Sequence, residues 1–407
     1  MAENFIRSIL RKTGAVVRPL WSFLTRYWAR VVILTCIGLY VSEKLDQTGS
    51  WLSFRYQIFQ ALQFVSPRPA QPQRTALVLI NDDDHYGPEL QGRSPTQRDY
   101  LARVVTALSD ANAAVIALDF NFASPSPTGN PIEEPQYRTE TDALRNAIFN
   151  AAKAGRKIVL TKSIDKAADH VFAEESDVYG PDPASWKNVS TGYDALPDDV
   201  RNLPLRVKSN HGGFLESFAL AVARSENAAS LENIPDLSAT YYAGFLPEKK
   251  FKAVVSAGDL LRGKTDMVTT KVVFVSGKWR EFAKDRGHIV PAYDSPVGEL
   301  PGVFFHANYF EALYDARIYR VWEGRLKIAA EAVLSILVAL SFYFTLSSKI
   351  KALGLYLFPY FIILLITYVS LISFGWFFDP LIPTVVIGAH GVLEQIHRWR
   401  KSEKSKH

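Results

Sequence analysis

The chain has 407 residues, of which 48% are hydrophobic and 21% charged, and its formal net charge is +5 at pH 7. Its single cysteine, Cys36, excludes a disulfide framework and a cysteine-based metal site. The basic residues gather near the two ends of the chain, so the positive charge indicates membrane flanks and argues against a nucleic-acid partner.

The N-terminus combines basic residues with apolar residues at roughly helical spacing. Residues 1–26 therefore predict a basic, amphipathic cytoplasmic helix that lies against membrane lipid. Residues 27–42 follow as the first membrane span. A cleaved signal peptide is the competing interpretation, but no small-x-small cleavage site follows the apolar run.

Residues 43–327 read as one globular domain exported across the membrane. A helix over residues 43–66 should open it and end at a group of prolines. Three strands and two helices then alternate: Ala76–Asn81, Thr96–Ala111, Ala114–Phe120, Thr141–Ala154 and Lys157–Thr161. Continuous apolar strands that alternate with amphipathic helices predict an α/β fold with a doubly wound, largely parallel sheet.

The alternation returns after a loop-rich middle segment. We expect a helix, two strands and another helix at Gly212–Arg224, Tyr241–Gly244, Lys271–Ser276 and Val303–Tyr314. A last helix through Ile318–Trp322 should then lead directly into the second membrane span.

The C-terminal part is mostly apolar and divides into three further spans. These are residues 328–346, 353–374 and 378–396, each with about the 20 residues that a bilayer requires. The link after the second span carries two lysines, and residues 397–407 form a basic tail. The positive-inside rule places both termini in the cytoplasm, so we expect a multi-pass protein of the bacterial inner membrane with a large periplasmic domain.

Three groups of residues occur in a recognisable order. The first is a pair of strands that end in Asn81-Asp82-Asp83 and in Asp119-Phe120. The second is a loop that contains Gly192-Tyr193, Asp198-Asp199, Arg201 and Pro204-Leu205. The third follows the strand KVVFVS and comprises Asp294-Ser295-Pro296 and the helix start PGVFFHAN, which includes His306 and Asn308.

Together these groups resemble the CHASE2 extracytoplasmic sensory domain. Two details depart from the family pattern: Val200 follows Asp199 directly, and one strand ends Val275-Ser276-Gly277 instead of in Ile-Gly. The resemblance implies a sensor with three trailing spans and a cytoplasmic output module. Only eleven residues follow Ile396, so we expect a separate cytoplasmic signalling protein to read this sensor, which we also expect to form homo-oligomers.

Polar residues at the strand ends are the candidate ligand-binding site, because ligands of open α/β sheets bind at the carboxyl ends of strands. The candidates are Asp82, Asp83, Asp119, Asp294, His306 and Asn308. No cofactor is expected, although clustered carboxylates suit Mg²⁺ or Ca²⁺. The competing interpretation is structural: capped loops, a histidine in the core and an asparagine that holds a turn.

Catalytic motifs are missing from the sequence. None of the eight histidines lies in a nucleophile-elbow, zinc or phosphate-loop motif, so we expect a protein without enzymatic activity. A metal-dependent hydrolase that uses Asp82, Asp83 and Asp119 is the weakest alternative.

Ionisable residues also fall inside the predicted spans, where they are costly unless they face a bundle interior. They are Glu331 in the second span and His390 and Glu394 in the fourth. These residues keep a second function open, an oligomeric membrane effector or scaffold whose spans conduct ions.

Overall fold

The structure is a computed structural model. It describes residues 40, 49–64, 72–93, 96–122, 135–167, 170–173, 176, 178–179, 186–210, 213–234, 236–237, 239–283, 286–289, 292–321, 361 and 364–377. Two compact units divide the chain, one of Tyr56–Arg320 and one of Met1–Arg55 with Val321–His407. Apart from Tyr40, the predicted spans at 27–42, 328–346 and 378–396 lie outside the described residues. So do both basic tails and the polar residues Glu331, His390 and Glu394.

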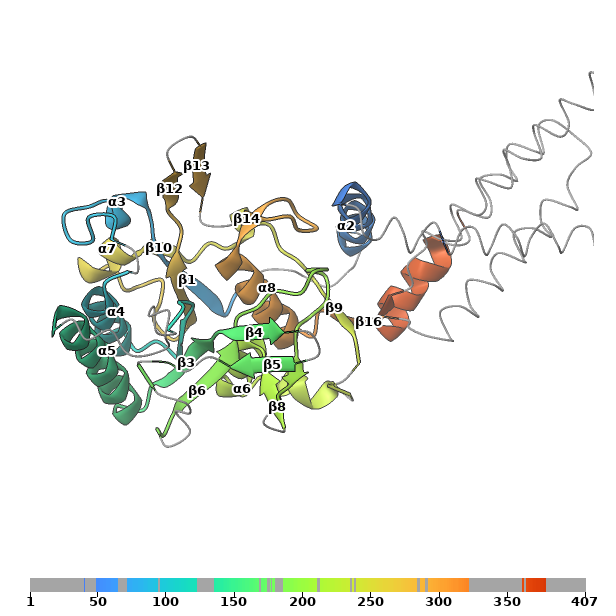
Figure 1. The fold of residues 1–407 in the computed structure, drawn as a ribbon. Helices are drawn as coiled ribbons and strands as arrows, with labels where there is room; N and C mark the ends of the chain where they lie inside the picture. Colours follow the sequence, from blue (N-terminus) through green and yellow to red (C-terminus); the bar gives the residue numbers. More distant parts are fainter. Residues whose placement is uncertain are drawn as a thin grey trace, which may run out of the picture. The chain divides into compact units, whose positions relative to one another are not determined.

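A six-stranded sheet forms the centre of the Tyr56–Arg320 unit (Figure 1). Its strands lie in the order β10-β1-β11-β2-β3-β6, and every neighbouring pair is parallel. Their bounds are β10 (Val254–Ser256), β1 (Thr75–Ile80), β11 (Val272–Gly277), β2 (Val115–Leu118), β3 (Lys157–Lys162) and β6 (Val189–Tyr193).

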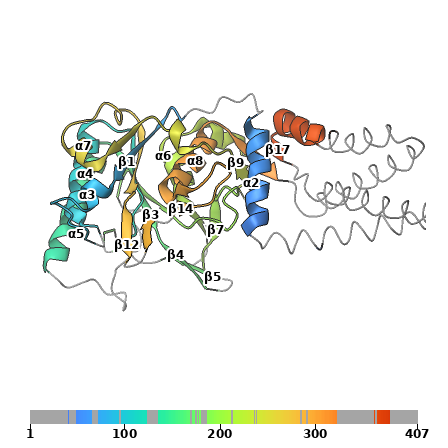
Figure 2. The same ribbon diagram turned by 90° about the horizontal axis from the view of Figure 1, so that it is seen from above.

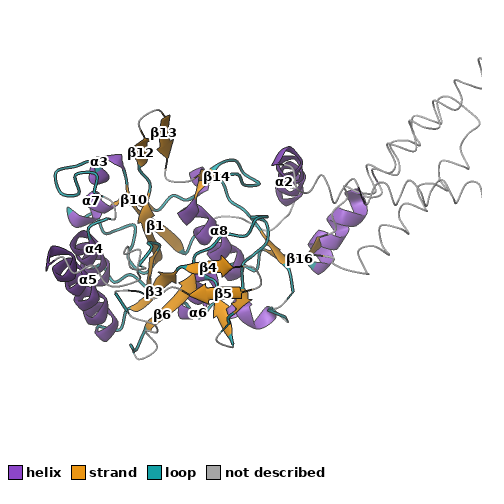
Figure 3. Cartoon of the chain, viewed as in Figure 1, coloured by secondary structure: helices purple, strands orange, loops and turns teal. Residues whose placement is uncertain are grey.

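Helices cover both faces of this sheet, as the three layers of Figures 2 and 3 show. One face carries α4 (Arg98–Asp110), α5 (Pro135–Lys153) and α7 (Ala257–Leu261), and the other carries α6 (Phe218–Ser225) and α8 (Gly302–Tyr314). Strands β1, β2 and β11 are buried at every position, as expected of strands covered on both faces. The predicted α/β fold with a parallel sheet is confirmed.

Further helices and short antiparallel strands surround the six-stranded sheet and its covering helices. The helices are α2 (Gly49–Phe64), α3 (Asp82–His85), η2 (Ala229–Asn233) and η3 (Glu248–Lys250). Five antiparallel pairs are β4 (Ile164–Ala167) with β5 (His170–Ala173), β7 (Arg206–Lys208) with β8 (Phe214–Glu216), β12 (Arg280–Ala283) with β13 (Arg286–Ile289), β14 (Ala292–Tyr293) with β15 (Leu300–Pro301), and β9 (Tyr241–Ala243) with β16 (Ile318–Val321).

Two predicted helices differ from the structure, one in part and one entirely over its described residues. The helix expected at Gly212–Arg224 begins only at Phe218, because the Ser217 hydroxyl accepts a hydrogen bond from the Leu220 amide (3.2 Å) and caps it there. The residues just before it form β8. The helix expected through Ile318–Trp322 is wrong as well, since Ile318–Val321 is strand β16, whose Tyr319 is paired with Tyr242 of β9.

The sheet order also corrects an assumption about the strand ends. Asp82, Asp83 and Asp119 were grouped as one candidate site at the ends of β1 and β2, but β11 lies between these two strands and pairs with both. The short strand β10 was not predicted, and it extends the sheet beyond β1. Three residues are too few to show an apolar period, which explains the omission.

The described part of the second unit is small. Residues 364–374 are helical, and Trp376–Phe377 forms strand β17. Several apolar side chains of this helix are exposed, among them Leu364, Leu365 and Ile366. Within the described residues, no helix combines the length and the apolarity that crossing a bilayer requires.

Candidate functional site

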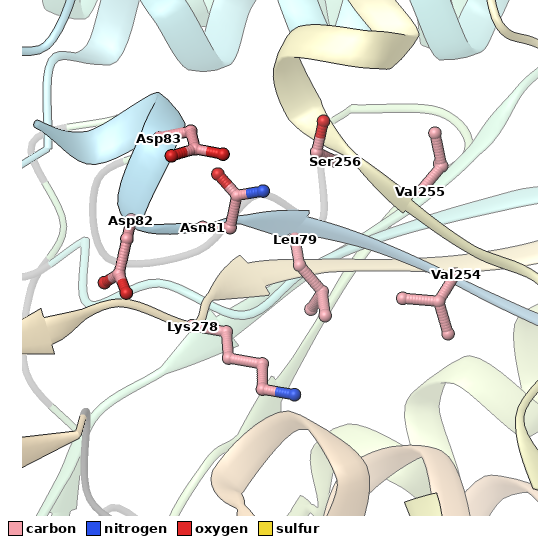
Figure 4. A pocket seen from close by; sticks show the side chains of 8 residues that line it. All are labelled: Leu79, Asn81, Asp82, Asp83, Val254, Val255, Ser256 and Lys278. Atoms are coloured by element: carbon pink, nitrogen blue, oxygen red, sulfur yellow. The ribbon is translucent and has the colours of Figure 1, made fainter. Parts of the chain in front are cut away.

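A cavity of about 390 Å³ opens at the carboxyl ends of β10, β1 and β11 (Figure 4). Its floor consists of the apolar side chains at the ends of β1 and β10, and its rim is polar. The rim residues are Asn81, Asp82, Asp83, Ser256 and Lys278. The strand order creates this cavity, because β10 and β11 flank β1 and all three strands end at the same edge.

The charges of the rim lie on two sides of the β1 end. In Figure 4, Asp83, Asn81 and Ser256 lie on one side of the strand and Lys278 on the other. The Lys278 ammonium forms an ion pair with Glu248 and lies 5.5 Å from the centre of the Phe304 ring. The rim therefore offers both carboxylates and a cation within one cavity.

Asp84, which follows these two aspartates, has a structural role. Its carboxylate accepts hydrogen bonds from the Gly258 amide (3.1 Å) and the Asn81 amide (3.4 Å), and it joins α3 to the start of α7. A Cβ atom on Gly258 would lie 2.3 Å from the Asp84 carboxylate, so only glycine allows this approach. Burial raises the pKa of Asp84 above its ordinary value, against the hydrogen bonds that lower it.

Asp82 and Asp83 differ from Asp84 in exposure. Asp83 is exposed and Asp82 half-buried, and both line the cavity. Sequence reasoning missed Ser256 and Lys278, which come from β10 and from the residue after β11. The position of Lys278 directly after a buried strand was the one available signal.

A second polar cluster lies where β2 and β11 end. The Ser276 hydroxyl donates a hydrogen bond to the Asp119 carboxylate (3.0 Å), and His306 Nε2 lies 3.8 Å from the other Asp119 oxygen. His306 is buried with its ring edge-to-face against Phe218, and burial lowers its pKa although Asp119 opposes the change. Asp119 and His306, two of the candidate ligand-binding residues, therefore lie next to each other.

The order of groups in this cluster differs from that of a catalytic triad. Asp119 lies between the serine and the histidine, whereas serine hydrolases need the histidine next to the hydroxyl. The Asp119 cluster is also separated from Asp82 and Asp83 by the end of β11. Among the described residues, no three His, Cys, Asp or Glu side chains gather as metal ligands.

The remaining two candidates do not line either group. Asn308 is fully buried, and its amide binds the backbone of Leu246 (2.7 Å and 3.2 Å) and the Phe304 carbonyl (2.8 Å). It therefore ties α8 to the segment after β9. Asp294 is exposed in the turn after β14.

The loop between β6 and β7 carries a further cluster, whose Asp199 and Arg201 belong to the second signature group but were not candidate site residues. Arg201 is fully buried, and its guanidinium is paired with the Asp199 carboxylate (2.6 Å). The same guanidinium lies 4.6 Å from the ring centre of Tyr242 and 5.5 Å from that of Tyr56 on α2. We call Tyr56, Asp199, Arg201 and Tyr242 the arginine cluster.

Hydrogen bonds extend the arginine cluster to two helices. The Val200 amide donates to the Tyr56 hydroxyl (3.2 Å), and the Tyr309 hydroxyl of α8 donates to the Val200 carbonyl (2.8 Å). About two turns further along α2, Gln63 accepts a hydrogen bond from the Phe245 amide (2.8 Å). Tyr56 thereby fixes α2 to the loop that contains Arg201, and Gln63 fixes it to the segment after β9.

Comparison with known proteins agrees with the family resemblance of the sequence. The model of the CHASE2 domain matches residues 31–342, which is more than half of the chain. No curated protein and no solved structure matches it. CHASE2 is an extracytoplasmic sensory domain of membrane proteins. With its parallel sheet and its three signature groups in order, this chain belongs to the CHASE2 domain family.

Proposed function

We propose that the protein is a transmembrane sensor whose external domain binds a small polar signal and passes the change to a separate cytoplasmic signalling protein. The observation that carries the proposal is the attachment of α2 to the domain through the arginine cluster. In the sequence, α2 begins at Gly49, shortly after the predicted first span at 27–42. A movement of the Asp199–Arg201 loop would therefore act on the chain that enters the membrane.

The cavity at the ends of β10, β1 and β11 is the proposed signal site. Its rim holds negative charge on Asp82 and Asp83 and positive charge on Lys278. A ligand with an ammonium and a carboxylate group would meet both signs. Lys278 is paired with Glu248 at the start of the segment that leads to β10, so a bound anion would compete for that ion pair.

The Asp119 cluster supports a role in binding or folding and not in catalysis. The Ser276 hydroxyl donates to a carboxylate, which is a weak base for activating it, and His306 contacts the far side of that carboxylate. We infer that the protein is not an enzyme.

The membrane arrangement proposed here has four spans with both ends in the cytoplasm. Its support is the charge pattern of the sequence, the CHASE2 family match and the exposed apolar side chains of residues 364–374. We infer a bacterial inner-membrane location, contacts with lipid, a homo-oligomer and no nucleic-acid partner. The basic ends of the chain are the proposed contact for the cytoplasmic partner.

A ligand screen on the full-length protein in lipid nanodiscs tests the proposal. Amino acids, other polar metabolites, Mg²⁺ and Ca²⁺ are added one at a time, and the thermal unfolding temperature is measured. We expect at least one zwitterionic compound to raise this temperature, and Lys278→Gln and Asp82→Asn to abolish the rise. No shift with any compound, or an unchanged shift in both variants, would contradict the signal site.

A second measurement separates the sensor from the pore-forming alternative. The purified protein is reconstituted into liposomes loaded with a fluorescent dye and a potassium gradient. A sensor should leave the liposomes sealed at protein-to-lipid ratios where a pore-forming control empties them. Leakage that depends on protein concentration would favour the effector.

A further inference from the structure

A second pocket of about 370 Å³ lies between the loop that follows β6 and the β7–β8 hairpin. This volume falls near the lower end of the roughly 300–1,000 Å³ that small-molecule sites occupy. Most of its lining residues lie between Tyr193 and Val207, and the others are Phe214, Leu237, Ala239 and Thr240. The pocket is separate from the cavity at the ends of β10, β1 and β11, with which it shares no lining residue.

Apolar groups form most of its wall. Leu203, Leu205 and Val207 line it together with prolines of the loop. Phe214 also lines it, although 57% of this side chain is exposed. A large aromatic group left open to solvent at the mouth of an apolar pocket gains stability when a ligand covers it.

The apolar wall of this pocket includes one cationic side chain, Arg206. The guanidinium of Arg206 lies 4.3 Å from the centre of the Phe214 ring. Its Nε is buried and makes no hydrogen bond with any described residue. A buried donor without a partner is costly, and a carboxylate can accept from two guanidinium nitrogens at once.

The acidic residue on the neighbouring strand does not satisfy this donor. Glu216 is opposite Arg206 in the β7–β8 pairing. Its carboxylate binds the Nε of Arg224 instead, at 2.9 Å. Glu216 is thus paired with Arg224, and the Arg206 charge on the side of the pocket is left in excess.

We propose that this pocket binds a small monocarboxylate with an aromatic or branched apolar body, with its carboxylate on Arg206 and its body against Phe214. A single guanidinium in an apolar wall suits one negative charge better than a phosphate, which usually meets several cations and backbone amides. The carboxylate belongs to a free organic acid or to the C-terminus of a short peptide, which present the same chemistry.

The position of the pocket links this site to the arginine cluster. Asn202 and Leu203 line the pocket and directly follow Val200 and Arg201. The Leu203 amide donates to the Tyr241 carbonyl (2.7 Å), so the loop is held on the strand that carries Tyr242. A ligand in the pocket thus contacts the loop that fixes α2, which extends the proposed sensor without depending on the first cavity.

Binding of phenylacetate to the full-length protein in nanodiscs tests the proposal. Isothermal titration calorimetry is used, with phenylacetamide as the uncharged analogue and the dipeptide Gly-Phe as a peptide C-terminus. We expect phenylacetate or Gly-Phe to bind at least tenfold more tightly than phenylacetamide. The stronger of the two identifies the source of the carboxylate, and no preference for either acid over the amide would overturn the proposal.

Variants locate the site. Arg206→Gln should weaken binding at least tenfold, whereas the same change at the exposed Arg262 should leave it unaltered. Glu216→Gln removes the competing carboxylate and should strengthen binding severalfold, which keeps the test valid if Arg206→Gln does not fold. Equal affinity in all three variants would place the ligand elsewhere, and a loss in Lys278→Gln instead would assign it to the first cavity.

Discussion

The arginine cluster and the Asp119 cluster are both buried polar groups built around an aspartate, but they differ in how fully that aspartate is engaged. Asp199 binds the Arg201 side chain through both carboxylate oxygens and also accepts from the Arg201 amide. Asp119 accepts one hydrogen bond, from Ser276, and has His306 at 3.8 Å. The first cluster holds a helix in place, and the second lies at an open sheet edge.

This difference shows that residue type alone does not separate structure from function. An aspartate whose oxygens are all bound by the protein has no capacity left for a ligand. An aspartate at a strand end that keeps a free lone pair does have this capacity. The same contrast recurs within three residues, because Asp84 is bound to Gly258 and Asn81 while Asp83 is exposed.

The largest effect should come from the arginine cluster. Arg201→Met leaves Asp199 without its partner and removes the ring contacts to Tyr56 and Tyr242, so we expect a loss of about 3 kcal/mol in the free energy of unfolding. Chemical denaturation of the full-length protein measures it. The exposed Arg262→Met change should have no measurable effect, and equal stability of both variants would break the comparison.

Removal of the Asn308 amide should come next. Asn308→Ala leaves the backbone groups of Leu246 buried and without their partners, with an expected cost of about 2 kcal/mol. Chemical denaturation again provides the value. Asn308→Asp keeps one acceptor for the Leu246 amide and should recover part of this loss. If Asn308→Ala were as stable as the original protein, the amide would have a role other than folding.

Neighbouring aspartates provide a smaller, matched test. Asp84→Ala should cost about 1 kcal/mol because the Gly258 and Asn81 amides lose their acceptor. Asp83→Ala should not change the thermal unfolding temperature, since that side chain is exposed. For the affinity of a ligand of the first cavity we expect the opposite ranking. Asp83→Ala should lower this affinity more than Asp84→Ala does.

The smallest effect is a pH dependence at His306. Burial lowers its pKa below the ordinary value of 6.5, so in the window below 6.5 the unfolded chain binds more protons than the folded one. The free energy of unfolding should therefore fall as pH drops below 6.5, and this slope should be absent in His306→Gln. Denaturation at a series of pH values measures both proteins.

Asp119 supplies the control for that slope. Its negative charge raises the pKa of His306 against the effect of burial. Asp119→Asn should therefore lower this pKa further and extend the pH-dependent window to more acidic values. A window that narrows in Asp119→Asn would mean that the two side chains do not interact.

Several features were predictable because they depend on local order. The strands Thr75–Ile80 and Val272–Gly277 are continuous apolar runs, and such runs are typical of parallel strands covered on both faces. The helix at Gly302–Tyr314 was placed to within one residue at its start. The family resemblance also came from short motifs that can be read without a structure.

Other features were not predictable because they depend on partners far apart in the sequence. Ile318–Val321 reads as a helix by itself, and its pairing with Tyr241–Ala243 makes it a strand. The first cavity needs Ser256 and Lys278, and the second pocket needs Phe214, none of which forms a motif with the other lining residues.

The sequence by itself determined the fold class, the family and the predicted topology in the membrane, because apolar period, charge and short motifs are local properties. Only the tertiary structure decided which polar side chains are already bound by other groups of the protein. It placed β11 between β1 and β2, which separated Asp82 and Asp83 from Asp119. It also left Arg206 with a buried donor and no described partner, because hydrogen-bond satisfaction depends on neighbours that only folding brings together.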